Sequence, residues 1–254
     1  MYHFLLRLGA DPQLQNRFGC SASSNALGLG RENRIPFSIT DEAVADDSGF
    51  TPLHTAVVLH APSPSEELLR QAFRDINTPD TSGKTPLHWA CIKGDCVAVQ
   101  LLLQFGADVT LEDYAGSSAL HYASASGNAS IVTSMLDGGA AVDAIDAWGS
   151  TPLHRLRDSN AHLVSSMVHR GANVNQQDFF GNTAVHYAAS DDRATLAHQL
   201  LQVGSDHLIP DSSGVLPVHT AVIDDNPEVF SVLLSCHSDA PVSVTLWCDI
   251  ERPY

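Results

Sequence analysis

Six histidines recur at a regular spacing, and histidine is a residue type that can bind zinc or transfer protons. Each lies three residues after a slot that usually holds threonine or serine. The slots are Thr51, Thr85, Ser118, Thr151, Thr183 and Leu216, and the histidines are His54, His88, His121, His154, His186 and His219. The slot recurs at intervals of 34, 33, 33, 32 and 33 residues. A fixed period of this length predicts an array of structural repeats.

The spacing of the histidines favours a structural role over a metal site. Zinc needs three or four ligands at about 2.0–2.3 Å from one ion, whereas helices in neighbouring repeats lie ~8–10 Å apart and each repeat offers one such histidine. A threonine in the slot can cap a helix, and the histidine then falls on the third helical position, whose side chain can reach back to the cap. We expect the histidines to cap helices and to tie each helix start to the preceding turn, with no metal bound.

Each repeat is predicted to contain a tight turn and two short helices. A loop that begins with Asp and ends with Gly precedes each slot, as in "DTSGKT" and "DAWGST". Asp can bond its own backbone and Gly accepts a positive φ, so these loops are turns. The segment "TPLHWACIKG" has an apolar face at helical spacing, and the leucine-rich "CVAVQLLLQFG" ends at Gly106, where a helix favours glycine.

The repeat unit resembles the ankyrin repeat. Residues 83–115, "GKTPLHWACIKGDCVAVQLLLQFGADVTLEDYA", meet that family's pattern almost fully, and further matches begin at Gly116, Gly149, Gly181 and Gly214. The resemblance implies an all-α ankyrin-repeat α-solenoid of helix-turn-helix units with short β-turn tips. The predicted organisation is a partial N-terminal repeat at 1–19, a degenerate repeat or insert at 20–48, an array of about six repeats at 49–240 and a C-terminal tail at 241–254.

Three repeats depart from the pattern, and we expect them to be the weaker units. The repeat from Gly49 has Pro62 and Pro64 between its helices. The repeat from Gly149 lacks one residue and the usual alanines. The last repeat has Leu216 in place of the capping threonine.

Composition limits the kind of partner and the compartment. With 29 acidic and 13 basic residues, the net charge of −16 argues against direct nucleic-acid binding and favours a basic or neutral protein partner. The five cysteines are an odd number at irregular spacing, which indicates a reducing compartment, the cytoplasm or nucleus. We expect a soluble monomer without a membrane segment, because no apolar run approaches the ~18 residues of a membrane span, and we find no signal-peptide pattern at the start.

Other motifs with a chemical appearance have structural explanations. "SGKT" at 82–85 resembles the end of a phosphate-binding loop, but Thr78 stands where that loop needs glycine. Cys91 and Cys96 form a pair without a second pair of ligands, and "ALGLG" at 26–30 lacks the third glycine of a dinucleotide site. We therefore expect no cofactor, no metal and no catalytic residue.

The variable positions of the repeat are the candidates for binding. By resemblance to the family, the ligand surface is the concave face made by the turn tips and the exposed side of each first helix. Aromatic residues and arginine, which are enriched at binding hot spots, occupy both places. The predicted partner-binding residues are Trp89, Tyr122, Arg155 and Tyr187, each directly after a repeated histidine, and Tyr114, Trp148, Phe179 and Phe180 in the tips. The alternative is that these rings pack between neighbouring repeats.

The predicted function is a protein-protein interaction module and scaffold that does no chemistry. An alternative is a regulatory ankyrin domain or fragment of a larger protein, such as a transcription regulator or an ankyrin-containing palmitoyltransferase. A third possibility is an enzyme with an atypical site in residues 20–48 or in the tail. The partner itself does not follow from the sequence, because one scaffold hosts many functions.

Overall fold

The computed structural model describes residues 48–59 and 66–235. The predicted partial repeat, the tail, and all but the last residue of the predicted segment 20–48 lie outside the described residues, as do Pro62 and Pro64. The chain divides into two compact units, unit 1 at Met1–Tyr114 and unit 2 at Ala115–Tyr254. Each unit is described by itself.

Unit 1 contains two helical pairs and the turns that follow them. Its helices are α3 (Pro52–Leu59), α4 (Glu66–Gln71), a 3-10 turn at Phe73–Asp75, α5 (Pro86–Lys93) and α6 (Cys96–Gln104). Helix α3 packs on α5, and α5 packs on α6. The core of the unit includes the fully buried side chains of Leu53, Leu87 and Leu102.

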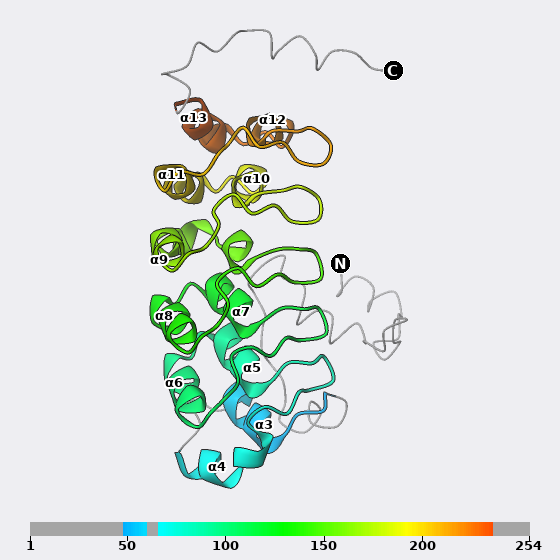
Figure 1. Ribbon diagram of the computed structural model, residues 1–254, viewed down its shortest axis with the longest axis vertical. Coiled ribbons are helices and arrows are strands. Elements are labelled where there is room, and N and C mark those ends of the chain that lie inside the picture. The colour runs from blue at the N-terminus through cyan, green and yellow to red at the C-terminus, as the bar shows by residue number, and fades with distance from the viewer. Residues whose placement is uncertain (1–47, 60–65, 236–254) are drawn as a thin grey trace, which may run out of the picture. The chain divides into compact units, whose positions relative to one another are not determined.

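Unit 2 repeats the same plan four times. Its elements are α7 (Ala119–Ser126), α8 (Ala129–Asp137), 3-10 helices at Pro152–Arg155 and Asp158–Asn160, α9 (Leu163–His169), α10 (Ala184–Ser190), α11 (Ala194–Gln202), α12 (Pro217–Ile223) and α13 (Pro227–Ser235). In Figure 1 the second helices α8, α9, α11 and α13 form one column, and the first helices of the repeats form a second column beside it. As predicted, the described residues form helices and turns, with no extended strand among them.

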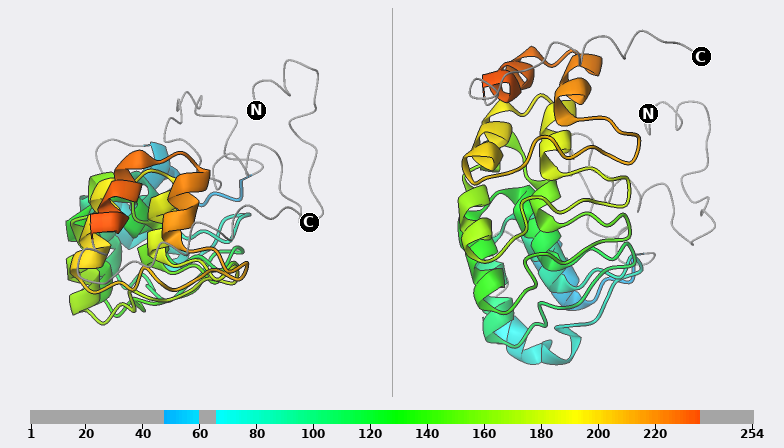
Figure 2. Two further views of the ribbon diagram at one scale, coloured as in Figure 1. Left: turned by 90° about the horizontal axis from the view of Figure 1, so that it is seen from above. Right: turned by 45° about the horizontal axis from the view of Figure 1, so that its top comes forward.

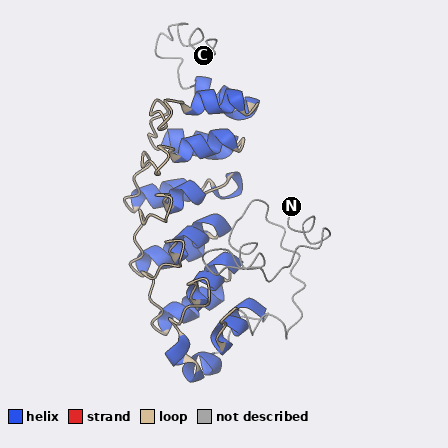
Figure 3. Ribbon diagram, turned by 90° about the vertical axis from the view of Figure 1, so that its right-hand side faces the viewer, coloured by secondary structure: helices blue, strands red, loops and turns tan. Residues whose placement is uncertain are grey.

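The turn tips of unit 2 all project from the side of the first helices. Figure 2 shows these loops extending away from the helices in the same direction, and Figure 3 shows them along one edge of the helix stack. The core lies between the two helix columns and includes the fully buried Leu120, Ile131, Met135, Leu163 and Leu196. The exposed rings of the tips lie outside this core.

The first helices begin where the sequence predicts. Thr85 has an extended backbone (φ −82°, ψ 167°), Pro86 is the first residue of α5, and Thr85 and His88 form a capping box. Ser118 with His121 and Thr183 with His186 do the same for α7 and α10. The repeated threonine and histidine are therefore helix-start residues, as expected from their spacing.

The repeat from Gly149 differs from the prediction of a regular first helix. Its first segment is a 3-10 helix that ends at Arg155, in the repeat that lacks one residue and the usual alanines. Asn160 donates to the carbonyl of Ser124 (2.8 Å), and Asp158 accepts from the amide of Leu196 (2.8 Å). Asp192 after α10 and Asn226 after α12 make equivalent bonds, so these bonds link neighbouring repeats and do not decide the helix type.

Candidate functional site

Backbone hydrogen bonds join the turn tips of adjacent repeats within each unit. The donor is the backbone amide of the residue that directly follows the turn aspartate. The acceptor is a backbone carbonyl in the preceding repeat, that of the residue two positions after the turn aspartate of that repeat. In unit 2 the pairs are Ala147 with Ala115, Phe179 with Trp148, and Ser212 with Phe180, at 2.9, 3.0 and 3.0 Å. Adjacent tips are therefore held in a fixed register.

The repeated turn aspartate holds its own tip through one carboxylate oxygen. Asp146 Oδ1 accepts hydrogen bonds from the amides of Trp148 (2.9 Å) and Ser150 (3.0 Å). The same pair of bonds recurs at Asp80, Asp178 and Asp211. This confirms the predicted turn chemistry of the Asp and explains the uniform shape of the tips.

The second carboxylate oxygen is bonded by the residue that follows the repeated histidine. Trp89 Nε1 donates to Asp80 Oδ2 at 2.8 Å, and the Tyr187 hydroxyl donates to Asp178 Oδ2 at 2.6 Å. The Arg155 guanidinium forms an ion pair with Asp146 Oδ2. Sequence reasoning missed this contact, although the constant separation of nine residues between aspartate and donor was available as a signal.

Unit 1 contributes two of the predicted binding residues, and only one of them is exposed. Tyr114 is 75% exposed at a turn tip, and its ring covers Gly83, where an added Cβ would lie 2.7 Å from Tyr114 Cδ1. Trp89 is only 6% exposed, since it donates to Asp80 and its ring contacts Phe50 edge-on. The expectation that Trp89 presents its ring on the surface is therefore corrected.

Unit 2 exposes three aromatic rings on two adjacent tips. Trp148 is 42% exposed, Phe179 is 68% exposed and Phe180 is 57% exposed. Arg155 and Tyr187 lie behind these rings and are partly buried, and Tyr122 is also partly buried. The structure thus separates the predicted set into exposed tip rings and half-buried side chains of the first helices.

Two of the exposed rings have fixed neighbours. The Arg155 guanidinium carbon lies 5.9 Å from the centre of the Trp148 ring, within the range of a cation–π contact. The Phe179 ring covers Gly149, which has φ +77°, and a Cβ there would lie 2.6 Å from Phe179 Cδ1. These contacts restrict the rings before any partner binds.

Nδ1 is bonded in all six repeated histidines, and Nε2 is bonded to a carbonyl in at least four of them. In all six histidines, Nδ1 accepts from the amide of the slot residue at 3.0–3.2 Å. Nε2 lies 2.9–3.2 Å from a carbonyl oxygen just before the next slot, in the pairs His54–Lys84, His121–Ser150, His154–Asn182 and His186–Val215. An amide can only donate and a carbonyl can only accept, so in these four pairs the ring is neutral with its proton on Nε2.

This arrangement corrects one part of the sequence prediction. The histidines cap helices as expected, but Nε2 binds the turn of the following repeat, whereas the sequence led us to expect a tie to the preceding turn. Burial lowers the pKa of His54, His154 and His186, while the bonded carbonyl and nearby aspartates act in the opposite direction. A proton on Nδ1 would face the slot amide, so the geometry also favours the neutral ring.

The remaining chemical motifs have structural partners. Lys84 of "SGKT" is buried, and its Nζ lies 3.3 Å from Asp113 Oδ2. Cys91 is a buried free thiol whose pKa is raised by burial, and Cys96 is a partly buried free thiol. Within 48–59 and 66–235, no group of three or more metal-binding side chains is brought together.

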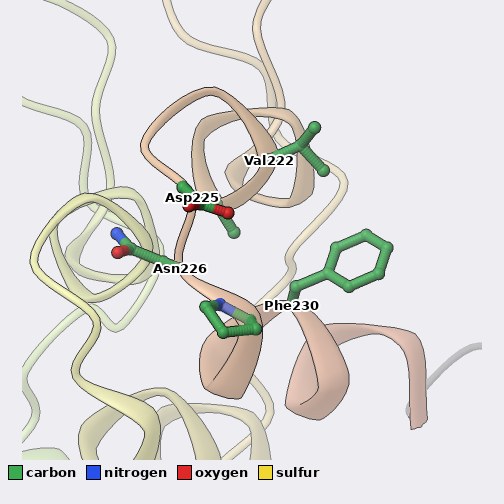
Figure 4. Close-up of a pocket in the computed structure, with 6 residues that line it drawn as sticks. Val222, Asp225, Asn226 and Phe230 are labelled. Atoms are coloured by element: carbon green, nitrogen blue, oxygen red, sulfur yellow. The ribbon is translucent and has the colours of Figure 1, made fainter.

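A shallow pocket of about 230 Å³ lies at the last described repeat. Val222, Asp225, Asn226 and Phe230 line it, together with Ala221 and Pro227 (Figure 4). Its lining has no ion pair and no cluster of acid and base groups. It offers apolar contact without reactive groups.

Comparison with protein families agrees with this repeat geometry. A model described as ankyrin repeats matches the chain in three copies, over residues 59–146, 98–178 and 153–244. Comparison with curated proteins finds no match. Of the helices in the described ranges, none has the length and apolar character needed to cross a membrane.

Proposed function

The chain belongs to the ankyrin-repeat family, and we propose that it is a protein-binding module whose contacts are made by the exposed aromatic rings of its turn tips. Ankyrin repeats are in general protein-interaction modules. The observation that carries the proposal is the exposure of Trp148, Phe179 and Phe180 on two adjacent, hydrogen-bonded tips. Large aromatic rings dominate the energy of protein interfaces when a partner buries them.

The fixed positions of the rings support this proposal. Ordering a mobile side chain on binding costs about 0.5–1.5 kcal/mol. Phe179 already lies against Gly149, and Trp148 already lies against Arg155. Both rings therefore lose less freedom on binding than an unsupported ring would lose.

The chemistry of the partner follows from the charge and from the tip residues. We propose an apolar contact segment with basic or neutral flanks, because Ile145, directly before Asp146 in the chain, is also exposed and the chain carries a net charge of −16. Residues 115–235 of unit 2 contain twelve acidic residues against four arginines and no lysine, and Arg155, Arg170 and Arg193 pair with aspartates, so the net charge of this part is negative. Such a field attracts basic proteins and repels nucleic acid.

We further propose that the module is a non-catalytic monomer in the cytoplasm or nucleus. The repeated histidines are engaged in helix capping and repeat stacking, which supports a structural role for them. Free thiols at Cys91 and Cys96 support a reducing compartment. The same surface would serve if the repeats regulate a larger polypeptide.

The test is affinity purification with the full chain as bait, followed by mass spectrometry. Proteins retained by the wild-type chain are compared with those retained by Trp148→Ala and Phe180→Ala, and the strongest is then measured with purified components. We expect each variant to weaken binding by roughly 30-fold or more, equivalent to about 2 kcal/mol at a hot spot.

Val97→Ala is the matched control, because Val97 is an exposed apolar residue on α6, outside the tips. It should bind as the wild type does. Equal retention by the wild type and both tip variants would refute the proposal.

A further inference from the structure

We infer that Arg155 and Tyr187 are positioning residues that couple the tips at 146–150 and 178–182 into one surface. The inference rests on the proposed function, because it explains how the exposed rings of two repeats are presented together. Neither residue needs to touch the partner. Each acts through a buried aspartate that holds a tip.

In the first tip, Asp146 connects the backbone to the residue behind the exposed ring. Its Oδ1 accepts from the amides of Trp148 and Ser150, and its Oδ2 pairs with Arg155. Arg155 in turn lies 5.9 Å from the Trp148 ring centre. One carboxylate therefore fixes both the backbone of Trp148 and the group that its ring contacts.

Arg155 depends on this arrangement for its own position. Its Nε is buried and has no hydrogen-bond partner within the described part of the chain. The ion pair with Asp146 and the contact with Trp148 therefore hold the guanidinium.

In the second tip, Asp178 has the same role with a different donor. Its Oδ1 accepts from the amides of Phe180 (2.9 Å) and Asn182 (2.8 Å). Its Oδ2 accepts from the Tyr187 hydroxyl at 2.6 Å. The Tyr187 phenol is therefore bound to the tip that carries Phe179 and Phe180.

Tyr187 also reaches the first tip. Burial and the bond to Asp178 raise the pKa of Tyr187 to about 12, while the nearby Ser150 and the charge of Arg155 act in the opposite direction. The ring of Tyr187 contacts His154 edge-on at 5.7 Å. Tyr187 thus interacts with Asp178 of its own tip and with Ser150, His154 and Arg155 of the preceding repeat.

The side-chain network adds to a direct backbone link between the tips. Phe179 N donates to Trp148 O at 3.0 Å. Two independent connections mean that a shift in one tip is transmitted to the rings of the other. The consequence is a surface whose three rings respond together.

The experiment uses Tyr187→Phe in the full chain, because this change removes the hydroxyl and keeps the ring. Hydrogen exchange measured by mass spectrometry should become roughly fivefold faster in both tips, 146–150 and 178–182, as expected for loss of about 1 kcal/mol from one hydrogen bond. With 5-fluorotryptophan, the fluorine resonance of Trp148, assigned with Trp148→Phe, should also shift. If the Tyr187 hydroxyl acted only on its own tip at 178–182, its removal would not shift the Trp148 resonance.

Trp89→Phe is the matched control, because it removes the equivalent donor to Asp80 in unit 1. It should accelerate exchange at 81–84 and leave the Trp148 resonance unchanged. Arg155→Met is a second variant that should shift the same resonance and accelerate exchange at 178–182. Circular dichroism at 222 nm establishes that each variant is folded.

The inference is overturned if Tyr187→Phe accelerates exchange only at 178–182, or if the Trp148 resonance stays in place in both variants. Its failure can be distinguished from failure of the proposed function. If the tips are coupled but Trp148→Ala binds the partner as the wild type does, the binding proposal is refuted and the coupling stands. If the tips are independent but Trp148→Ala weakens binding, the coupling is refuted and the binding proposal stands.

Discussion

Replacing Gly149 with alanine should both destabilise unit 2 and displace the exposed Phe179 ring. Gly149 has φ +77°, a conformation that costs an L-residue about 1–2 kcal/mol. The new Cβ would lie 2.6 Å from Phe179 Cδ1, so the ring must move away. About a third of the ring is buried, and for a side chain of roughly 200 Å² this area contributes about 1.5 kcal/mol. The expected loss is therefore about 3 kcal/mol.

Gly139→Ala supplies the matched comparison. Gly139 has φ +91° in the same unit, but nothing lies within 4 Å of an added Cβ. It should lose only the conformational part, about 1–2 kcal/mol. The free energy of unfolding is measured in the full chain by guanidinium titration, followed by circular dichroism. Equal losses in the two variants would refute the claim that Phe179 is held against Gly149.

Three further predictions concern the stability of the repeats. Burial lowers the pKa of His54, His154 and His186 in the folded protein, so the unfolded chain takes up protons more readily below pH ~6.5. The free energy of unfolding, measured by denaturant titration, should therefore fall as the pH drops from 7.5 towards 5.5, and a flat profile would contradict the tautomer assignment. Asp225 has φ +57° and an exposed side chain, so Asp225→Gly should raise the free energy of unfolding by about 1 kcal/mol, whereas a loss of stability would show that its carboxylate has a required partner. Because the histidines cap helices, EDTA should leave the melting curve unchanged, and stoichiometric zinc in the purified protein would contradict this.

The sequence predicts the parts of the fold that are set by short-range chemistry. The aspartate, glycine and threonine of the repeats and Nδ1 of the histidines act within a few residues of one another, so these roles can be read from spacing, whereas histidine Nε2 bonds a carbonyl 28–30 residues away. The repeat from Gly149 shows where this reasoning stops. Asn160 bonds Ser124, and Asp158 bonds Leu196, across 36 and 38 residues. Local propensity does not contain those contacts between repeats, whereas the missing residue and the missing alanines did mark this repeat as irregular.

The sequence identified the aromatic residues of the candidate surface, but it did not show which of their rings are exposed. Trp89 and Trp148 are the same residue type on the same repeat plan, yet one is 6% exposed and the other 42% exposed. The slot of Trp89 places its indole N–H within reach of Asp80, whereas Trp148 lies in the tip beyond its own aspartate. Residue type alone therefore identifies an aromatic ring, and the position relative to the turn aspartate decides whether that ring is available to a partner.

The slot after the histidine is variable in sequence but constrained in chemistry. An indole N–H at Trp89, a guanidinium at Arg155 and a phenol at Tyr187 all donate to Oδ2 of a buried aspartate. A buried carboxylate without a second donor would be costly. In the last repeat Asp211 is only partly buried, and Thr220 donates to the carbonyl of Leu216 instead. Solvent can reach this carboxylate, so the slot no longer has to supply a long donor. In these four repeats the residue in the slot therefore follows the burial of the aspartate, and under the proposed function contact with a partner is left to the tip rings.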